Sequence, residues 1–264
     1  MTVAEALRLA EQQLAAAGVD TPRADAEWLL AHVLGVSRSA VYAATELDVP
    51  AELDDLLARR RKREPLAYVL GEWGFRRLTL KTDARALVPR PETEVVVERC
   101  LTLLRDQPDP RVLDLGTGTG AIGLAIADEH PGARVTGVDD SPDALELARE
   151  NAKRLGLDIE LRAGGLEIAS AGWDLVVSNP PYVSPDEWDF LQPEVRDWEP
   201  RAALVGEAMH EEIARLAHTG WLVLELGDGQ GDGVATALSR LGYTDVRISP
   251  DLTGRARVVE GRRS

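Results

Sequence analysis

The stretch Asn179-Pro180-Pro181-Tyr182 has the residue types best suited to chemistry in this sequence. It follows the apolar run from Trp173 to Ser178, and because neither proline donates a backbone N–H, a strand that reaches them must end and turn. The carbonyl groups of Asn179 and Pro180 are then free to point into a cavity, and the Asn179 side chain adds one acceptor and two donors. Two acceptors suit the two hydrogens of a planar NH2 group, with the Tyr182 ring over its face or packed against the incoming group. The stretch therefore predicts a site for an amide or an exocyclic amine, and a plain proline-rich turn is the alternative.

A glycine-rich loop precedes this stretch in the sequence. Gly116-Thr117-Gly118-Thr119-Gly120 stands between a predicted strand, Arg111 to Leu115, and a predicted helix, Ala121 to His130. Such a loop lets backbone come close to a ligand at the carboxyl edge of a parallel sheet. Its spacing departs from the G-x-G-x-x-G pattern of dinucleotide sites.

Three acidic residues flank the loop in the predicted fold. Asp139 and Asp140 end the next strand, where a carboxylate accepts hydrogen bonds from both hydroxyls of a ribose, and Asp114 precedes the loop, where it meets a cationic group of the ligand. S-adenosylmethionine carries an ammonium and a sulfonium, so acids at this place suit it better than they suit a pyrophosphate. The alternative for the pair is capping of the next helix, with Asp140 the better candidate.

The elements that must position these residues alternate between strand and helix from Arg111 onward. Ser141-Pro142 opens a helix to Leu155, and later strands are expected near Ile159 and at 174–178, 221–226, 246–249 and 257–260. This alternation predicts a mostly parallel sheet covered on both faces.

Residues 1–75 have only helical patterns, with segments from Ala4 to Ala17, from Pro22 to Leu34, from about Ser37 and after Pro50. We expect a small helical domain at 1–75, a hairpin linker at 76–88 with Phe75 to Lys81 as one of its strands, and a catalytic domain at 89–264. The run Arg59 to Arg63 is a solvated helix face or a C-terminal helix turn that complements the helix dipole, and the alternative is a contact for an acidic or RNA-bearing partner. Pro89-Arg90-Pro91 forms an extended segment that reads as a rigid hinge before a helix that runs to Leu104.

Composition narrows the class of protein. The chain has 264 residues, one cysteine and a net charge of −15, with no apolar run long enough to span a membrane. We expect a cytoplasmic monomer that binds a protein or a small molecule, with no direct nucleic-acid contact and no membrane contact. The four histidines, His32, His130, His210 and His218, lack the spacing of a metal site or a catalytic triad, so no metal is expected.

Four motifs in this order resemble the HemK/PrmC family, the peptide chain release factor glutamine methyltransferases. They are the glycine loop with its strand, Val112 to Ile122, and the segments Pro65 to Glu72, Pro89 to Glu94 and Ser178 to Tyr182. The resemblance covers the chain from the N-terminal helices to the last strand. It implies a class I methyltransferase fold, Rossmann-like with a seven-stranded mostly parallel sheet, behind a helical domain that helps to dock the release factor.

The resemblance also implies roles for single residues. Gly116, Thr117, Gly118, Thr119 and Gly120 wrap the methionine part of S-adenosylmethionine. Asp139 holds the ribose, and Asn179, Pro180, Pro181 and Tyr182 hold the glutamine amide, with Asn179 also beside the cofactor. Where the family has an acid and then a bulky residue near the adenine, this chain reads Ala163-Gly164-Gly165-Leu166, which makes Leu166 the candidate for contact with the ring.

Three other functions compete with glutamine methylation of release factors. Methylation of an adenine in nucleic acid presents the same NH2 group, but residues 76–264 carry 33 acidic and 22 basic residues, a net charge of −11. The second is methylation of a glutamine in a ribosomal protein. The third is a scaffold that binds the cofactor without activity.

Overall fold

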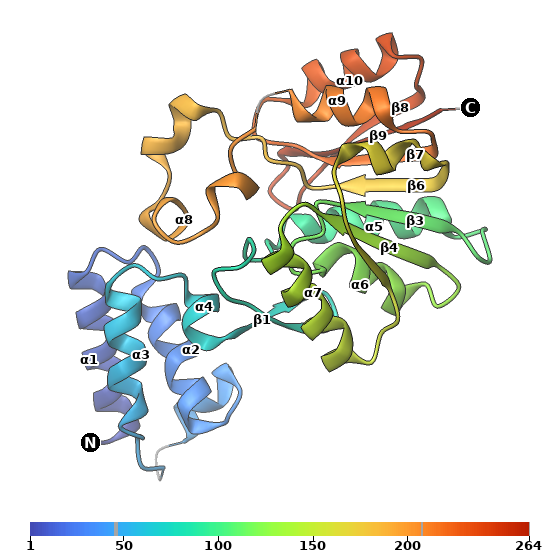
Figure 1. The fold of residues 1–264 in the computed structure, drawn as a ribbon. Coiled ribbons are helices and arrows are strands. Elements are labelled where there is room, and N and C mark those ends of the chain that lie inside the picture. Colours follow the sequence, from blue (N-terminus) through green and yellow to red (C-terminus); the bar gives the residue numbers. More distant parts are fainter. Residues whose placement is uncertain (45–46, 207, 264) are drawn as a thin grey trace. The chain divides into compact units, whose positions relative to one another are not determined.

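A computed structural model describes residues 1–44, 47–206 and 208–263 of the chain (Figure 1). The chain divides into two compact units, one formed by Met1–Glu72 with Gln192–Trp198 and the other by Trp73–Leu191 with Glu199–Ser264. Within the described ranges, every helix is too short or too polar to cross a membrane.

The first unit is helical, and its helices begin and end where the sequence has capping residues. Thr2 and Glu5 form a capping box at the start of α1, and Gly35 ends α2 with a left-handed backbone. Apolar side chains of these helices, among them Leu14, Leu29 and Leu57, form one buried core. The elements are α1 (Val3–Ala16), α2 (Pro22–Leu34), η1 (Arg38–Ala43), α3 (Glu52–Arg61), α4 (Leu66–Leu70) and α8 (Pro193–Arg196).

The basic run Arg59 to Arg63 begins in the last turn of α3, as one alternative predicted, and Arg59, Arg60 and Arg63 form ion pairs with carboxylates of the same unit. The Arg60 side chain is only 6% exposed and donates to Asp25 Oδ2 at 2.7 Å and to Glu194 Oε1 at 2.8 Å. Arg63 donates to both carboxylate oxygens of Glu194 at 2.6 Å. These bonds tie the segment Gln192–Trp198 to the helical unit, although it lies more than a hundred residues away in the sequence.

A two-stranded sheet of β1 (Glu72–Phe75) and β2 (Leu78–Lys81) follows the helices. The prediction of one strand from Phe75 to Lys81 was wrong, because the chain turns at Arg76 with a φ of 51°. The Arg76 backbone N–H and guanidinium both bind Glu94, at 2.9 Å to its Oε1 and at 3.2 Å to its carbonyl oxygen. These bonds hold the arginine in a conformation that its own propensity disfavours.

The second unit is built on a seven-stranded sheet with the order β5-β4-β3-β6-β7-β9-β8. Strands β5, β4, β3, β6 and β7 run parallel to one another, and β9 is antiparallel to both β7 and β8. The predicted α/β fold with a mostly parallel sheet is therefore confirmed. The strands are β3 (Arg111–Leu115), β4 (Arg134–Asp139), β5 (Glu160–Ala163), β6 (Trp173–Ser178), β7 (Thr219–Glu225), β8 (Thr244–Pro250) and β9 (Ala256–Arg262).

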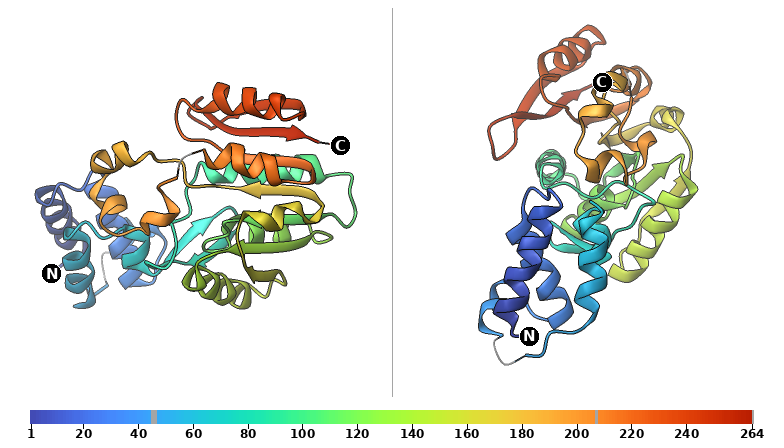
Figure 2. Two further views of the ribbon diagram at one scale, coloured as in Figure 1. Left: turned by 45° about the horizontal axis from the view of Figure 1, so that its top comes forward. Right: turned by 90° about the vertical axis from the view of Figure 1, so that its left-hand side faces the viewer.

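Helices cover both faces of this sheet (Figures 1 and 2). One face packs against α5 (Thr93–Leu104), α6 (Ala121–Glu129) and α7 (Pro142–Leu155), and the other against η2 (Leu166–Ala171), α9 (Met209–Leu216) and α10 (Gly231–Arg240). Two short helices, η3 (Pro185–Phe190) and η4 (Arg201–Ala203), lie in the connection after β6. Because β3 is paired with both β4 and β6, the strand order reverses beside β3, and a crevice for a ligand forms at its carboxyl end.

Candidate active site

A cavity of about 450 Å³ lies in the second unit, at the carboxyl ends of β3, β4 and β6. Its size is that of a site for a small molecule. It brings the glycine loop, the end of β4 and the start of Asn179-Pro180-Pro181 onto one wall. The predicted site residues that line it are Gly116, Thr117, Gly118, Thr119, Asp139, Leu166, Asn179, Pro180 and Pro181.

The glycine loop keeps its shape through backbone bonds that leave one side open. The N–H groups of Gly116 and Thr117 both donate to the Val138 carbonyl, at 2.8 and 2.9 Å. Gly116 has a φ of 73° and open space where a Cβ would stand, so the chain both needs glycine and leaves room there for a ligand. Gly120 lies outside the cavity wall and precedes α6, where a Cβ would come within 2.9 Å of Leu124 Cδ1.

Asp114 is fully buried under the loop and does not line the cavity, which corrects the expectation that it meets a cationic ligand group. Its Oδ2 accepts hydrogen bonds from Thr117 Oγ1 at 2.6 Å and from the Gly123 N–H at 3.0 Å. Burial raises the pKa of Asp114 to about 6, while these two bonds oppose the rise. The carboxylate therefore fixes the loop to the first turn of α6.

Asp139 lines the cavity at the end of β4 and binds backbone on both of its oxygens. Its Oδ2 accepts the Gly118 N–H at 2.9 Å and its Oδ1 accepts the Ser141 N–H at 3.0 Å. Each carboxylate oxygen keeps a second lone pair for a ligand hydroxyl. Burial raises the pKa of Asp139, and the Gly118 and Ser141 bonds oppose that rise. The predicted helix start at Ser141-Pro142 is confirmed, because Ser141 is the N-cap of α7 and accepts from the Ala144 N–H, and the alternative that Asp140 caps this helix is wrong.

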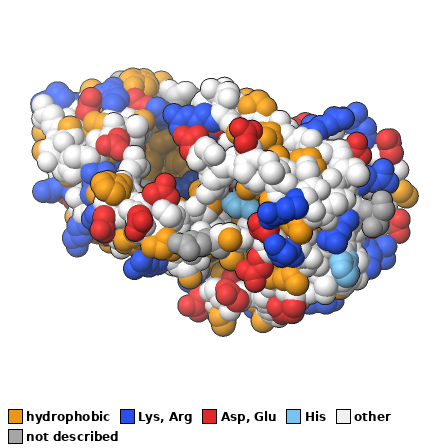
Figure 3. Space-filling view, turned by 90° about the horizontal axis from the view of Figure 1, so that it is seen from above, with side chains coloured by type: hydrophobic (Ala, Val, Ile, Leu, Met, Phe, Trp, Pro, Cys, Tyr) orange, Lys and Arg blue, Asp and Glu red, His pale blue; other side chains and the backbone are white. Residues whose placement is uncertain are grey.

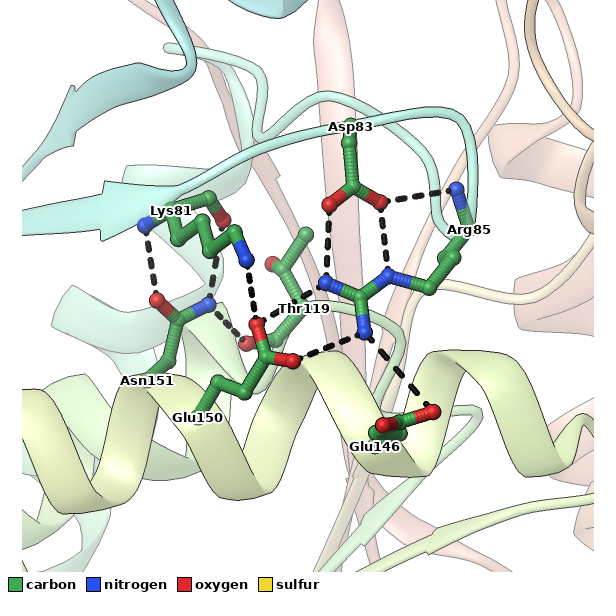
Figure 4. A network of polar contacts seen from close by, with 7 residues as sticks. All are labelled: Lys81, Asp83, Arg85, Thr119, Glu146, Glu150 and Asn151. Carbon is green, nitrogen blue, oxygen red and sulfur yellow. Dashed lines mark hydrogen bonds and ion pairs between the residues drawn. The ribbon is translucent and has the colours of Figure 1, made fainter.

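A polar network behind the loop was missed by the sequence analysis (Figure 4). The buried Asn151 side chain on α7 donates to the Thr119 carbonyl at 2.9 Å and to the Lys81 carbonyl at 3.1 Å, and it accepts the Lys81 N–H at 2.7 Å. Glu150, one residue earlier, accepts from Arg85 and Lys81. The network thus joins the loop, the segment after β2 and α7.

Asn179, Pro180 and Pro181 line the cavity, but Tyr182 does not. The Tyr182 carbonyl accepts from Gln230 Nε2 at 3.1 Å, and its ring lies so near Gly227 that a Cβ there would be 2.9 Å from Tyr182 Cδ2. Burial raises the pKa of Tyr182 to about 12, and Glu225 adds to that rise. The ring therefore packs behind the turn, whereas the sequence predicted it over the substrate.

The region after β5, where the family resemblance places the adenine, also lines the cavity. Gly164, Gly165 and Leu166 line the cavity, and the Gly164 N–H donates to the Asp139 carbonyl at 3.1 Å. Because this segment departs from the family pattern at the two glycines, it presents only backbone and the Leu166 side chain to the cavity.

The segment predicted as a hinge also forms a wall of the cavity. Pro89, Arg90 and Thr93 all line it. Arg90 donates to both oxygens of the buried Glu199, at 2.7 and 2.6 Å, and burial raises the pKa of Glu199 while Arg90 opposes the rise. The two prolines on either side of Arg90 were the sequence signal that this backbone is rigid. A rigid backbone suits a cavity wall as well as a hinge.

These features fit S-adenosylmethionine. The lining of the cavity combines an open glycine loop, a half-buried carboxylate with free lone pairs at Asp139, an apolar side chain at Leu166 and the residues Asn179 and Pro180. Among the described residues, no cluster of three His, Cys, Asp or Glu side chains could hold a metal ion. The fold and the site together define a class I methyltransferase.

Comparisons with known proteins identify the family. Residues 5–71 match the PrmC N-terminal domain and residues 95–192 match the methyltransferase small domain. The chain is 42% identical to the release factor glutamine methyltransferase of Deinococcus radiodurans, with 100% of this chain and 99% of that protein covered. It is 40% identical to the enzyme of the same name from Geobacter sulfurreducens, with 99% and 96% covered. The chain belongs to the release factor glutamine methyltransferase family, as its motifs predicted.

A solved structure with low sequence identity supports the fold. The hMettl16 catalytic domain has a TM-score of 0.59 at 14% identity, over 79% of this chain and 82% of that one. The class I methyltransferase fold predicted from the sequence is thus confirmed, and the protein is an S-adenosylmethionine-dependent methyltransferase.

Proposed function

We propose that this protein methylates the side-chain amide nitrogen N5 of the glutamine in the Gly-Gly-Gln motif of class 1 peptide chain release factors, in support of translation termination. The observation that carries the proposal is the cavity itself, in which Asn179, Pro180 and Pro181 share a wall with the glycine loop and Asp139. The relatives that match over the full chain carry the name of this activity.

In this proposal, the cavity holds the cofactor through residues 116–119, Asp139 and Leu166. The open side of Gly116 faces the methionine part, the carboxylate of Asp139 accepts from the ribose hydroxyls, and Leu166 packs against the adenine. S-adenosylmethionine supplies the methyl group on a positively charged sulfur.

An amide nitrogen is a poor nucleophile because its lone pair is delocalised into the carbonyl group. Catalysis then depends on position and on the local field. The side-chain carbonyl of Asn179 and the backbone carbonyl of Pro180 accept the two hydrogens of the amide, orient the nitrogen along the carbon–sulfur bond and favour the positive charge that builds on it. The nitrogen bonds to the methyl carbon as the carbon–sulfur bond breaks, the electron pair stays on sulfur, and the nitrogen loses its extra proton to water.

We assign the helical unit to docking of the intact release factor, on a cytoplasmic and monomeric enzyme. The unit has a core of its own, so it can present a surface without taking part in the cavity. Deleting residues 1–72 would also remove the partners of Glu194, so truncation is a poor test. The intact factor should instead have a much lower KM than a short peptide with the same Gly-Gly-Gln motif, and equal KM values would refute docking.

The test of the function is a comparison of substrates. Purified protein with labelled S-adenosylmethionine is incubated separately with a release factor, a ribosomal protein and DNA. We expect label only on the release factor, on the Gly-Gly-Gln glutamine by mass spectrometry, and none when that glutamine is changed to alanine. The acidic and basic side chains interspersed over the face in Figure 3 and the net charge of −15 favour a protein over DNA. Label on the ribosomal protein or DNA alone would refute the proposal.

A further inference from the structure

Thr93 and Glu225 form a buried pair at the edge of the cavity for which the mechanism above has no role. Thr93 is the first residue of α5 and lines the cavity together with Asn179 and Pro180. Its Oγ1 donates a hydrogen bond of 2.6 Å to Glu225 Oε2. Glu225 is the last residue of β7 and is only 1% exposed.

The sheet register places this pair beside the substrate motif. Strands β6 and β7 are parallel, with Ser178 opposite Leu224, so the next residues along them, Asn179 and Glu225, are neighbours at the carboxyl edge. Thr93 reaches that edge from the start of α5. Three separate segments thus meet where the glutamine amide would be held.

The direction of the bond decides what Thr93 offers to a ligand. A threonine hydroxyl has one proton and two lone pairs, so while the proton is given to the Glu225 carboxylate, only lone pairs are left for the cavity. Thr93 is then an acceptor, which suits an NH2 group and a nitrogen that becomes positive. If Glu225 is protonated, its carboxyl can donate to Thr93, and the threonine proton turns toward the cavity as a donor.

We infer that Thr93 is a further substrate-contacting residue and that Glu225 is a positioning residue, which keeps the Thr93 hydroxyl an acceptor for the glutamine amide. The inference rests on the proposed function and deepens it. The lone pairs of Thr93 share an amide hydrogen with one of the acceptors at Asn179 and Pro180, and the charge of Glu225 keeps the hydroxyl proton of Thr93 away from the amide.

The groups around Glu225 predict that the direction of the Thr93–Glu225 hydrogen bond changes near neutral pH. Burial raises the pKa of Glu225 to about 7, the Thr93 bond and the charges of Arg257 and Arg90 oppose the rise, and Glu92 adds to it. The other titratable groups that face Glu225 are Tyr182, whose pKa is raised to about 12, and His210, which binds the Glu225 carbonyl and whose pKa is lowered by burial. Tyr182 therefore stays neutral across the range, and His210 is neutral above its lowered pKa. Methyl transfer should rise with pH as Glu225 ionises around pH 7.

The experiment measures single-turnover methyl transfer to a purified release factor between pH 6 and 9, with S-adenosylmethionine affinity and thermal unfolding recorded for each variant. Thr93→Val should slow transfer roughly 10- to 100-fold, the scale of one hydrogen bond that involves a charged group, with cofactor affinity unchanged. Thr93→Ser keeps the hydroxyl and should restore most of the rate. Glu225→Gln has no charge to lose, so its rate should no longer rise around pH 7.

Thr102→Val is the matched control. Thr102 lies on the same helix, and its hydroxyl binds only the Glu98 carbonyl on the exposed surface. It should behave as the unaltered protein does. A normal rate for Thr93→Val, or the same pH rise in Glu225→Gln, would overturn the inference while leaving the proposed function intact. If Thr93→Val does not fold, the transfer rate of Thr93→Ser and the pH profile of Glu225→Gln test the inference instead. Failure of the unaltered protein to methylate the release factor would overturn the proposed function itself.

Discussion

Replacing Asp139 tests how the cavity holds the cofactor. Both oxygens of its carboxylate already accept backbone N–H groups, from Gly118 at 2.9 Å and Ser141 at 3.0 Å. A ribose bound there uses the remaining lone pairs. Asp139→Ala therefore removes the acceptors for the ribose and also the bond that fixes Gly118 in the loop.

The expected loss follows from the strength of hydrogen bonds to a charged group. Such bonds contribute ~1.5–3 kcal/mol, so the dissociation constant for S-adenosylmethionine should rise roughly 10- to 150-fold. Isothermal titration calorimetry measures it directly. Asp140→Ala is the control, because Asp140 also lines the cavity but is exposed and does not cap α7. Unchanged affinity in Asp139→Ala, or an equal loss in both variants, would refute the assignment of the ribose to Asp139.

Substitutions at three further positions test other parts of the structure. Tyr182→Phe should keep most of the single-turnover rate because the ring still packs behind the turn, and Tyr182→Ala should lose more; equal losses would contradict this role of the ring. Arg60→Met leaves the buried Asp25 without its ion-pair partner and removes one of the two arginines that bind Glu194, so it should lower the free energy of unfolding by ~3–5 kcal/mol in denaturant titrations, whereas the exposed neighbour Arg61→Met should have little effect. Asn151→Ala removes three bonds to backbone and should cost about 1–3 kcal/mol and weaken cofactor binding; unchanged stability would show that water replaces the amide.

Local patterns were enough to predict the sheet and the loop. The strand Arg111–Leu115 was predicted with its observed bounds, because an apolar run before a glycine loop is a short-range signal. The predicted residues 116–119, Asp139 and Asn179 meet in one cavity because parallel strands end at one edge.

Long-range pairs could not be predicted in the same way. Glu194 lies 134 residues from Arg60, and Glu225 lies 132 residues from Thr93, so neither pairing has a signal in the local sequence. The run Arg59 to Arg63 looked like a solvated basic face because Asp25 and Glu194, which bind Arg60 and Arg63, come from other segments. The position of Tyr182 behind the turn likewise depends on Gly227 and Gln230, which follow a later strand.

Single-turnover methyl transfer by Asn179→Ala, with bound S-adenosylmethionine quantified separately, tests the central claim most directly. The substitution removes the side-chain amide and leaves the backbone carbonyls, the prolines and the glycine loop in place, so cofactor binding should fall only modestly. Transfer to the release factor should fall by ~10²–10³-fold, the scale for loss of one preorganised group in an electrostatic site. Transfer near the rate of the unaltered protein would mean that Asn179 to Tyr182 is a structural turn and that the amide is held elsewhere.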